Sequence, residues 1–307
     1  MARYVSVRIG LGAVSVLGVI LLTFVLQYSL PGDPARRVAG PRASADVLER
    51  VREDLRLDDP LPVQLVTYVG GVLSGDLGTS YVQRRPVAEM ILERLPATLY
   101  LALAALVFEI VVGGALGVWD GLRREPSRIL AATNVVLLSV PTYTLGFLML
   151  FLFAYRLAIL PLGGGPGVPE LILPALALGL FGIPYYATVV SDAVREALAS
   201  SYVRTAVAKG LPTRGIIVRH VLRNSISPLI TLAGLDFAVF LSGVVFIEVV
   251  FGWPGIGSLQ QQAFDELDRP LLMGTVIVSA VLVISFNLLA DVVRAYVDPR
   301  TRAETIS

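Results

Sequence analysis

Six stretches of this chain are each long and apolar enough to cross a lipid bilayer as a helix. A hydrocarbon layer about 30 Å thick needs about 20 helical residues. Of the 307 residues, 55% are hydrophobic and only 16% are charged, whereas about a quarter of the residues in a soluble domain are charged. No stretch shows the alternation of apolar and polar residues that membrane β-strands have. The sequence therefore predicts an all-α integral membrane protein with six transmembrane helices, near residues 9–30, 97–119, 129–155, 171–194, 229–251 and 271–295.

Basic residues in the short loops predict the side that each loop faces, because such loops stay preferentially in the cytoplasm. The two short loops on the opposite side carry only Arg156 and Arg269. Both termini are therefore predicted to be cytoplasmic. The first apolar stretch exceeds the usual core of a signal peptide, which favours an uncleaved anchor over a cleaved signal. The basic residues on the predicted cytoplasmic side are Arg3, Arg8, Arg123, Arg124, Arg128, Arg195, Arg204, Lys209, Arg214, Arg219, Arg223, Arg294, Arg300 and Arg302.

The segment 31–96, between the first two apolar stretches, is predicted to be extracytoplasmic. Apolar residues recur at helical spacing between charged ones, which predicts an amphipathic helix over residues 46–57. A weaker helix is predicted over residues 63–73, before a glycine-rich turn. Two interpretations stand together: a cap packed on the outer mouth of the bundle, and a platform on which an extracytoplasmic partner docks.

A basic loop, residues 195–228, interrupts the apolar pattern between the fourth and fifth stretches. Ser200 or Ser201 can cap a short helix that follows, and Gly210 is the residue type that ends a helix in the left-handed conformation. Thr213 then starts a second helix. Two arginine-rich helices joined by a Gly-Leu-Pro turn indicate a rigid projection that transmits force to a cytosolic partner. Contact of the arginines with anionic lipid headgroups is the alternative.

Five motifs, spread in order over nearly the whole chain, carry a family resemblance. They are Leu30-Pro31-Gly32-Asp33-Pro34, Gly75-Asp76-Leu77-Gly78-Thr79-Ser80, the basic-loop sequences YVRTAVAKGL and RHVLRNSISP, the run from Glu248 to Gly257, and Asp298-Pro299-Arg300. The chain resembles the permeases of binding-protein-dependent ABC importers of the dipeptide, oligopeptide and nickel group. One departure is Arg204, which stands where the generic importer motif has an acidic residue. The peptide branch generally tolerates that change.

This resemblance implies a single permease domain over residues 1–307, with a core at 97–296 of the type I importer kind and a coupling helix inside the loop 195–228. It implies a bacterial inner-membrane complex with a second, similar permease, giving a heterodimer. Two cytosolic subunits would bind ATP and Mg²⁺, and an extracytoplasmic solute-binding protein would deliver the cargo. ATP-driven closure of those two subunits would swing the spans between outward and inward states. Di- and oligopeptides are the leading cargo, with nickel chelates and glutathione-like peptides as alternatives.

The ATPase contact is predicted on the first helix of the basic loop. Tyr202, Ala206, Lys209 and Gly210 are spaced to fall near one face, away from Arg204 and Val207. The contact is centred on residues 205–211. The predicted set is Tyr202, Arg204, Thr205, Ala206, Ala208, Lys209, Gly210 and Leu211.

Carboxylates inside the apolar stretches are functional candidates, because charge in lipid is costly. Asp236 and Glu109, with Phe240 and Gly243, are predicted to line the pathway. The alternative for the carboxylates is a protonated or hydrogen-bonded group at a helix contact. Glu248 lies roughly 120° from Asp236 around the same helix. Glu248 is therefore predicted to be tied to the turn that follows it, in an outer-mouth motif of Glu248, Phe251, Trp253, Pro254, Gly255 and Gly257.

Small residues and prolines predict features of packing. Gly113 and Gly117 are spaced as in closely packed helix pairs, and packing within the chain is favoured over a subunit interface. Pro141, Pro174 and Pro184 remove backbone donors and are predicted to kink the third and fourth stretches.

The chain carries no sign of catalytic machinery, so we expect no enzyme and no bound metal or cofactor. Lys209 is the only lysine and lacks the glycine-rich phosphate loop, and His220 has no Cys, Asp or Glu at ligand spacing. The net charge of +1 gives no basis for nucleic-acid binding. The rival functions are an ion-coupled carrier or channel that uses Glu109 and Asp236, and a membrane scaffold. Such carriers usually show paired repeats, and none is visible in this sequence.

Overall fold

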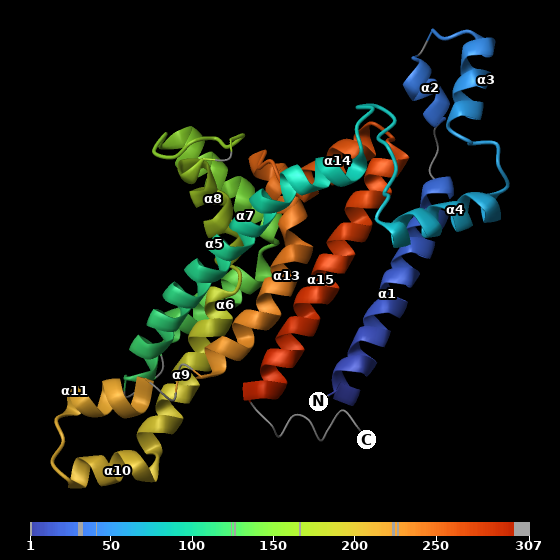
Figure 1. The fold of residues 1–307 in the computed structure, drawn as a ribbon. Coiled ribbons are helices and arrows are strands. Elements are labelled where there is room, and N and C mark those ends of the chain that lie inside the picture. The colour runs from blue at the N-terminus through green and yellow to red at the C-terminus, as the bar shows by residue number, and fades with distance from the viewer. Residues whose placement is uncertain are drawn as a thin grey trace.

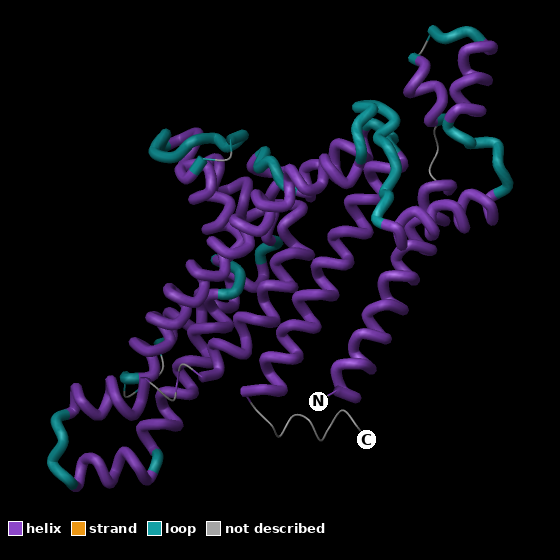
Figure 2. The backbone as a smooth tube through the Cα atoms, viewed as in Figure 1, coloured by secondary structure: helices purple, strands orange, loops and turns teal. Residues whose placement is uncertain are grey.

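The computed structural model describes residues 2–29, 33–40, 42–123, 125, 127–165, 167–222, 225 and 227–297. These residues form helices joined by loops, with one isolated bridge between Thr79 and Pro86 and no strand within the described ranges (Figure 2). Several residues named above lie outside the described part. For Arg3, Gly243 and Arg294, the structure describes the helix that contains them but not the contacts that they make. The residues outside the described part are Leu30, Pro31, Gly32, Arg124, Arg223, Asn224, Ile226 and the whole segment 298–307.

Among the described residues, three helices are each long and apolar enough to cross a membrane. They are α1 (Ala2–Ser29), α5 (Val87–Gly121) and α15 (Arg269–Val297), with the apolar windows Ser6–Val25, Val87–Gly121 and Arg269–Val292. Helix α5 begins at Val87, ten residues before the predicted start of the second span at residue 97. Pro86 directly precedes α5, and Pro96 is accommodated inside it.

Two further predicted spans are bent pairs of helices. The third stretch forms α6 (Arg128–Ser139), α7 (Thr142–Met149) and the π-helix η1 (Leu150–Arg156). The fourth forms α8 (Val168–Gly179) and α9 (Ile183–Ala199), bent by 61° across a short break. Prolines explain both breaks, because Pro141 lies between α6 and α7 and Pro184 lies in the first turn of α9. Pro174 lies inside α8, which continues through it, so the kink predicted at that residue stays a prediction.

The fifth stretch forms α13 (Ser227–Phe251), and a turn leads from it to α14 (Ile256–Asp265) before α15. Every predicted apolar stretch thus coincides with a helix or a bent pair. By length and composition, the described residues provide three membrane-crossing helices, or up to five when each bent pair counts as one span. The described residues are therefore all-helical, with helices apolar enough for the membrane protein that the sequence predicts, and the count of six spans stays a prediction.

The segment between α1 and α5 contains three short helices, α2 (Pro34–Ala39), α3 (Ala45–Asp54) and α4 (Leu61–Ser74). The helices predicted at 46–57 and 63–73 are confirmed as α3 and α4, with shifted ends. Arg52 of α3 pairs with Asp33, the N-cap residue of α2, at 2.6 Å. Figure 1 shows α2 and α3 projecting beyond one end of the bundle.

Helix α5 packs closely against α9, because three glycines of α5 face α9. A Cβ atom on Gly113 would lie 2.7 Å from Tyr186 Cβ, one on Gly117 would lie 2.6 Å from the Ala187 carbonyl oxygen, and one on Gly121 would lie 2.7 Å from Val194 Cβ. The prediction that Gly113 and Gly117 pack spans within the chain is confirmed. The two backbones meet along most of the length of α9.

The basic loop leaves the bundle at the end opposite α2 and α3 (Figure 1). It contains α10 (Ser201–Ala208), α11 (Thr213–Ile216) and the π-helix η2 (Ile217–Leu222). The N-terminus of α1 lies toward the same end of the molecule as α10. The chain thus presents two distinct ends, one formed by α2–α4 and the other by α10 and α11.

Candidate functional site

The turn between α10 and α11 has the geometry that the sequence predicts. Gly210 has a φ of +72°, the left-handed conformation that glycine adopts without steric cost. Its N–H donates to the Val207 carbonyl at 2.9 Å, and the Leu211 N–H donates to the Ala206 carbonyl at 3.2 Å, which closes the last turn of α10. The second helix starts at Thr213, as predicted. The predicted serine cap is absent, because the Ser200 hydroxyl donates back to the Ala197 carbonyl instead.

Most of the predicted ATPase-contact set is exposed at the tip of this loop. Tyr202 is 40% exposed and Leu211 is 45% exposed. Ala206 is a correction, because it is only 5% exposed and packs inward together with Val203, so it does not share the outer face with Tyr202. The exposed members of the set are Tyr202, Arg204, Thr205, Ala208, Lys209, Gly210 and Leu211.

Arg204 has a structural contact that the sequence does not reveal. Its guanidinium donates to the Ala199 carbonyl at the C-terminal end of α9, at 3.0 Å. A cation at a helix C-terminus meets the negative end of the helix dipole. The arginine that replaces the acidic residue of the importer motif therefore joins α10 to α9 within this chain.

An apolar cluster fixes the basic loop rigidly to the bundle. Val203 and Ala206 of α10 pack with Ile216 and Val221 of the returning segment. The cluster continues along one face of α9 and reaches α13, with Tyr186, Val190, Val194, Ala197 and Leu229 as its other buried members. Protein interiors are close-packed, so α10 meets α9 through side-chain contacts and not only through the connecting backbone.

A polar cluster at the end of α5 nearest the basic loop adds a second connection. The buried Asp120 carboxylate accepts from the Ser127 N–H at 2.7 Å, from the Ser191 hydroxyl at 2.8 Å and from the Arg195 guanidinium at 2.7 Å. These contacts join the end of α5, the start of α6 and the middle of α9. Asp120 was missed in the sequence because its partners lie far apart along the chain.

Replacing Asp120 with alanine is expected to lower the free energy of unfolding by about 2 kcal/mol, because three donors around a buried site would lose their acceptor. Asp192→Ala is the matched control. Asp192 also faces Arg195, at 3.7 Å, but its side chain is 72% exposed, so we expect a change within about 0.5 kcal/mol. Thermal unfolding of the purified variants in detergent measures the difference. Equal melting temperatures for the two variants would contradict the role given to Asp120.

Glu109 and Asp236, predicted separately from the sequence, meet at the break between α8 and α9. A Cβ atom on Gly182 would lie 1.3 Å from Glu109 Oε1, so the carboxyl group occupies the space that this glycine leaves open. The Tyr186 hydroxyl, which the sequence did not single out, faces Asp236 without the geometry of a hydrogen bond. Glu109 Oε2, Asp236 Oδ2 and the Tyr186 hydroxyl are buried and have no hydrogen-bond partner among the described residues.

The other two candidates for the pathway lining do not join this group. Phe240 is 5% exposed and belongs to the main apolar core, with residues of α5, α7 and α8. The structure thus places Phe240 inside the bundle rather than on a surface open to a pathway. Gly243 lies in α13, and its surroundings are outside the described part of the chain.

Glu248 holds the turn between α13 and α14. Its buried carboxylate accepts from the Thr98 hydroxyl at 2.7 Å, from the Gly257 N–H at 2.6 Å and from the Ser258 N–H at 3.1 Å. Two of these donors belong to the first turn of α14, where backbone N–H groups have no partner inside the helix. The carboxylate therefore caps α14 from the preceding helix.

The aromatic residues of the turn attach it to α5. The Trp253 indole N–H donates to the Ala97 carbonyl at 2.9 Å, and the Ile256 N–H donates to the Thr98 hydroxyl at 2.8 Å. Phe251 and Trp253 are 2% and 3% exposed. Gly255 is required by close approach, since a Cβ atom there would lie 2.0 Å from Glu248 Oε1. Pro254 lies between these contacts and is partly exposed.

Comparison with known proteins covers the chain almost from end to end. Residues 109–303 match the family described as binding-protein-dependent transport system inner membrane component, and residues 1–102 match the N-terminal membrane component of such systems. The chain is 37% identical over 305 residues to the glutathione transport system permease protein GsiC of Salmonella choleraesuis (strain SC-B67) and to that of Salmonella typhi, with 98% of this chain and 99% of each relative covered. The same protein of Escherichia coli (strain K12) is 36% identical over 305 residues, with the same coverage. The chain belongs to the family of binding-protein-dependent transport system inner membrane components and is the permease subunit of an ABC importer.

Proposed function

We propose that this permease forms half of the pathway of an ATP-driven importer for short peptides, and that α10 is the coupling helix on which an ATP-binding subunit acts. In this proposal six helices or bent pairs span the membrane, and the N-terminus, the C-terminus and α10 are cytoplasmic. The observation that carries the proposal is the exposed tip of α10, whose inner face packs in an apolar cluster with α9 at the end of the molecule opposite α2–α4. A loop that served only to meet lipid headgroups would not need this packing.

The route of force through the chain follows from its packing. Motion of α10 is passed to α9 through the apolar cluster and the Arg204 contact. Helix α9 carries α5 with it, because the glycines of α5 and the Asp120 cluster leave no room for the two helices to slide independently. The break between α8 and α9, with Glu109 packed into it, is one of two breaks within the predicted spans of the described residues. We propose that alternating access uses this bend.

The partners follow from the family. A binding-protein-dependent system implies a solute-binding protein outside and ATP-binding subunits inside. We propose two such ATP-binding subunits, which hold ATP and Mg²⁺, and a second homologous permease that makes a heterodimer with this chain. This permease is then non-catalytic. Membership of the family favours the ATP-driven importer over the ion-coupled carrier or channel.

The cargo is proposed from the family group and from the names of the relatives. Di- and oligopeptides remain the leading class, and the permeases named for glutathione transport favour glutathione-like peptides within it. Nickel chelates stay as an alternative from the same importer group. Asp236 and Glu109 are proposed to bound the pathway when the bundle opens, and Glu248 with its turn is proposed to hold the outer mouth in shape.

Substituting Tyr202 with alanine is expected to reduce ATP-dependent peptide uptake by about tenfold or more, because exposed aromatic residues at interface centres often contribute about 2 kcal/mol to binding. The measurement uses the whole complex reconstituted in liposomes and records both uptake and co-purification of the ATP-binding subunits. Val218→Ala is the control, because Val218 is exposed on η2 outside the predicted contact. Unchanged uptake and assembly of the Tyr202 variant would contradict the proposal. Uptake driven by a proton or sodium gradient without ATP would favour the ion-coupled carrier instead.

A further inference from the structure

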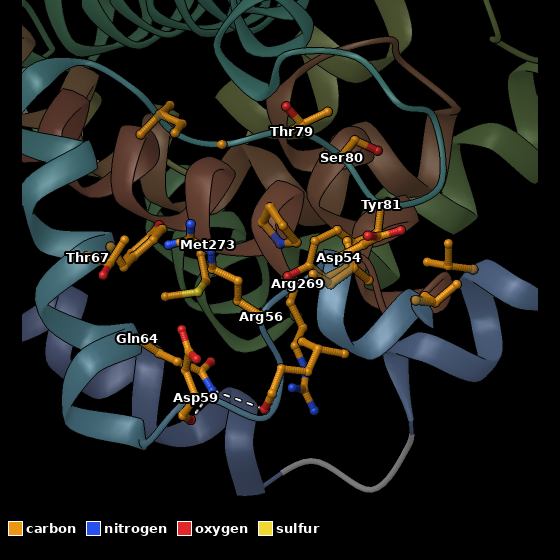
Figure 3. Close-up of a pocket in the computed structure, with 18 of the residues that line it drawn as sticks. Asp54, Arg56, Asp59, Gln64, Thr67, Thr79, Ser80, Tyr81, Arg269 and Met273 are labelled. Carbon is orange, nitrogen blue, oxygen red and sulfur yellow. Dashed lines mark hydrogen bonds between the residues drawn. The ribbon is translucent and has the colours of Figure 1, made fainter. Parts of the chain in front are cut away.

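A cavity of about 640 Å³ lies at the end of the molecule formed by α2–α4 (Figure 3). Its walls come from α3 and the connection to α4, from α4 itself, from the loop 77–84 and from the start of α15. Phe24 of α1 and Met273 of α15 contribute apolar surface. In Figure 3, Asp59 and Gln64 lie on one wall, Thr79, Ser80 and Tyr81 lie on another, and Arg56 and Arg269 lie between them.

The walls of this cavity are held by buried polar contacts. Asp268, fully buried just before α15, accepts hydrogen bonds from the Ser80 hydroxyl, the Tyr81 N–H and the Val82 N–H. On the opposite wall, the Gln64 amide donates to the carbonyl oxygens of Leu57 and Asp59 at 3.1 Å and 2.7 Å. The loop on each side is thus fixed in shape, as in a preformed ligand site.

Two arginines of the cavity have no partner in the described part of the chain. Arg56 and Arg84 are exposed, and no ion pair or hydrogen bond joins either guanidinium to a described residue. Both have left-handed backbone conformations, with φ of +51° and +53°, which non-glycine residues rarely adopt. At Arg56 this conformation ends α3, because the Leu57 N–H donates to the Arg52 carbonyl at 3.0 Å and the Arg56 N–H donates to the Glu53 carbonyl at 3.0 Å.

Other polar groups complete a lining that carries both signs of charge. Arg269 adds a third guanidinium, and Asp54 and Asp59 add two carboxylates. The Tyr68 hydroxyl is buried without a partner among the described residues, and burial raises its pKa, so it stays a neutral donor. Between these groups the wall is mainly apolar, with Val51, Leu55, Leu57, Leu77 and Pro270 as further members.

We propose that this cavity is an outer binding site for a short zwitterionic peptide, with Arg56 and Arg84 receiving its α-carboxylate. A guanidinium binds a carboxylate through two parallel hydrogen bonds, and an arginine without a protein partner keeps that capacity available. Asp54 and Asp59 offer acceptors for the peptide's amino group, and the apolar wall suits its side chains. The volume lies within the usual range for small-molecule sites, roughly 300–1,000 Å³. The inference rests on the proposed function, because it assigns the cargo class of that importer a first site on the permease.

Binding of the dipeptide Ala-Phe to the assembled transporter in nanodiscs, without a solute-binding protein, tests the proposal by isothermal titration calorimetry. The free dipeptide is expected to bind about tenfold or more tightly than its C-terminal amide, since charge-assisted hydrogen bonds would be lost. N-acetylation is expected to weaken binding as well. In the double variant Arg56→Gln/Arg84→Gln, the preference for the free carboxylate should disappear. Arg50→Gln, an exposed arginine of α3 outside the cavity, is the control and should keep it.

Equal binding of dipeptide and amide, no binding up to millimolar concentration, or unchanged binding in the double variant would each overturn the proposal. Loss of affinity for an empty solute-binding protein in the double variant, without peptide binding by the permease, would identify the cavity as a protein docking site and would also overturn it. ATP-dependent uptake separates this failure from failure of the proposed function. If ATP-dependent uptake persists but calorimetry shows no specific peptide binding, the outer peptide site is rejected and the proposed importer function stands.

Discussion

Replacing Gly117 with alanine is expected to separate α5 from α9 and to lower the free energy of unfolding by about 3 kcal/mol. The added methyl group would lie 2.6 Å from the Ala187 carbonyl oxygen, 2.7 Å from Val190 Cβ and 3.1 Å from Ala187 Cα. Two of these atoms are backbone atoms, which cannot move aside as the end of a flexible side chain can. Overpacking of this kind costs about 1–3 kcal/mol, with the upper end expected where backbones must separate. Thermal unfolding and the yield of monodisperse protein in detergent measure the effect.

Gly114→Ala is the matched control, on the same helix and with the same added methyl group. Its Cβ would meet only Leu229 Cδ1, at 3.6 Å, which is an ordinary contact. Because alanine favours helix over glycine by about 0.5–1 kcal/mol, this variant should be as stable as the wild type or slightly more so. If Gly117→Ala melted at the same temperature as Gly114→Ala, the close packing of α5 on α9 would be disproved.

Truncating Glu248 to alanine is expected to destabilise the protein by about 3–5 kcal/mol, since three donors in a buried site would lose their acceptor together. The carboxylate is 0% exposed, so water does not replace it without opening the turn between α13 and α14. The loss should appear as a lower melting temperature and as reduced uptake by the reconstituted complex.

Glu248→Gln separates the loss of hydrogen bonds from the loss of volume. Glutamine keeps one carbonyl oxygen for the α14 N–H groups, but its NH₂ group cannot accept from the Thr98 hydroxyl, which must turn to accept instead, so an intermediate loss of about 1–2 kcal/mol is expected. We expect the free energy of unfolding to fall in the order wild type, Glu248→Gln, Glu248→Ala. Two variants that are both as stable as the wild type would show that the carboxylate does not hold the turn.

Hydropathy located the helices because each predicted span is a long run of apolar residues, which only a helix can place in lipid. It did not locate their ends. Helix α5 starts at Val87 because the preceding proline can begin a helix, although residues 87–96 are more polar than the span that follows. The fourth span breaks between Gly179 and Ile183, next to Pro184, and Glu109 of α5 occupies the space beside Gly182 at this break. Hydropathy does not reveal that contact, because it joins helices far apart in sequence.

The candidate site was predictable where local geometry determines it. Gly210 reveals a left-handed helix end directly in the sequence, and the start at Thr213 follows from it. The inward position of Ala206 was missed because the helical period shows which residues share a face, but it does not show which face packs against the bundle. Asp120 and Tyr186 were missed because their partners come from other helices. For Asp120, the sequence offers one signal: a carboxylate at the end of an apolar stretch.

A single cysteine at position 209 can report whether α10 contacts an ATP-binding subunit, because the chain has no native cysteine to interfere. Lys209→Cys places a thiol at the exposed end of α10, and Asp58→Cys provides an exposed control between α3 and α4. Both variants are treated in membranes of the intact complex with a reagent that links a cysteine to a nearby lysine. If α10 contacts an ATP-binding subunit, we expect Lys209→Cys to crosslink to that subunit and Asp58→Cys not to do so. A crosslink from position 58 alone, or labelling of position 209 by an impermeant thiol reagent added outside intact cells, would contradict it.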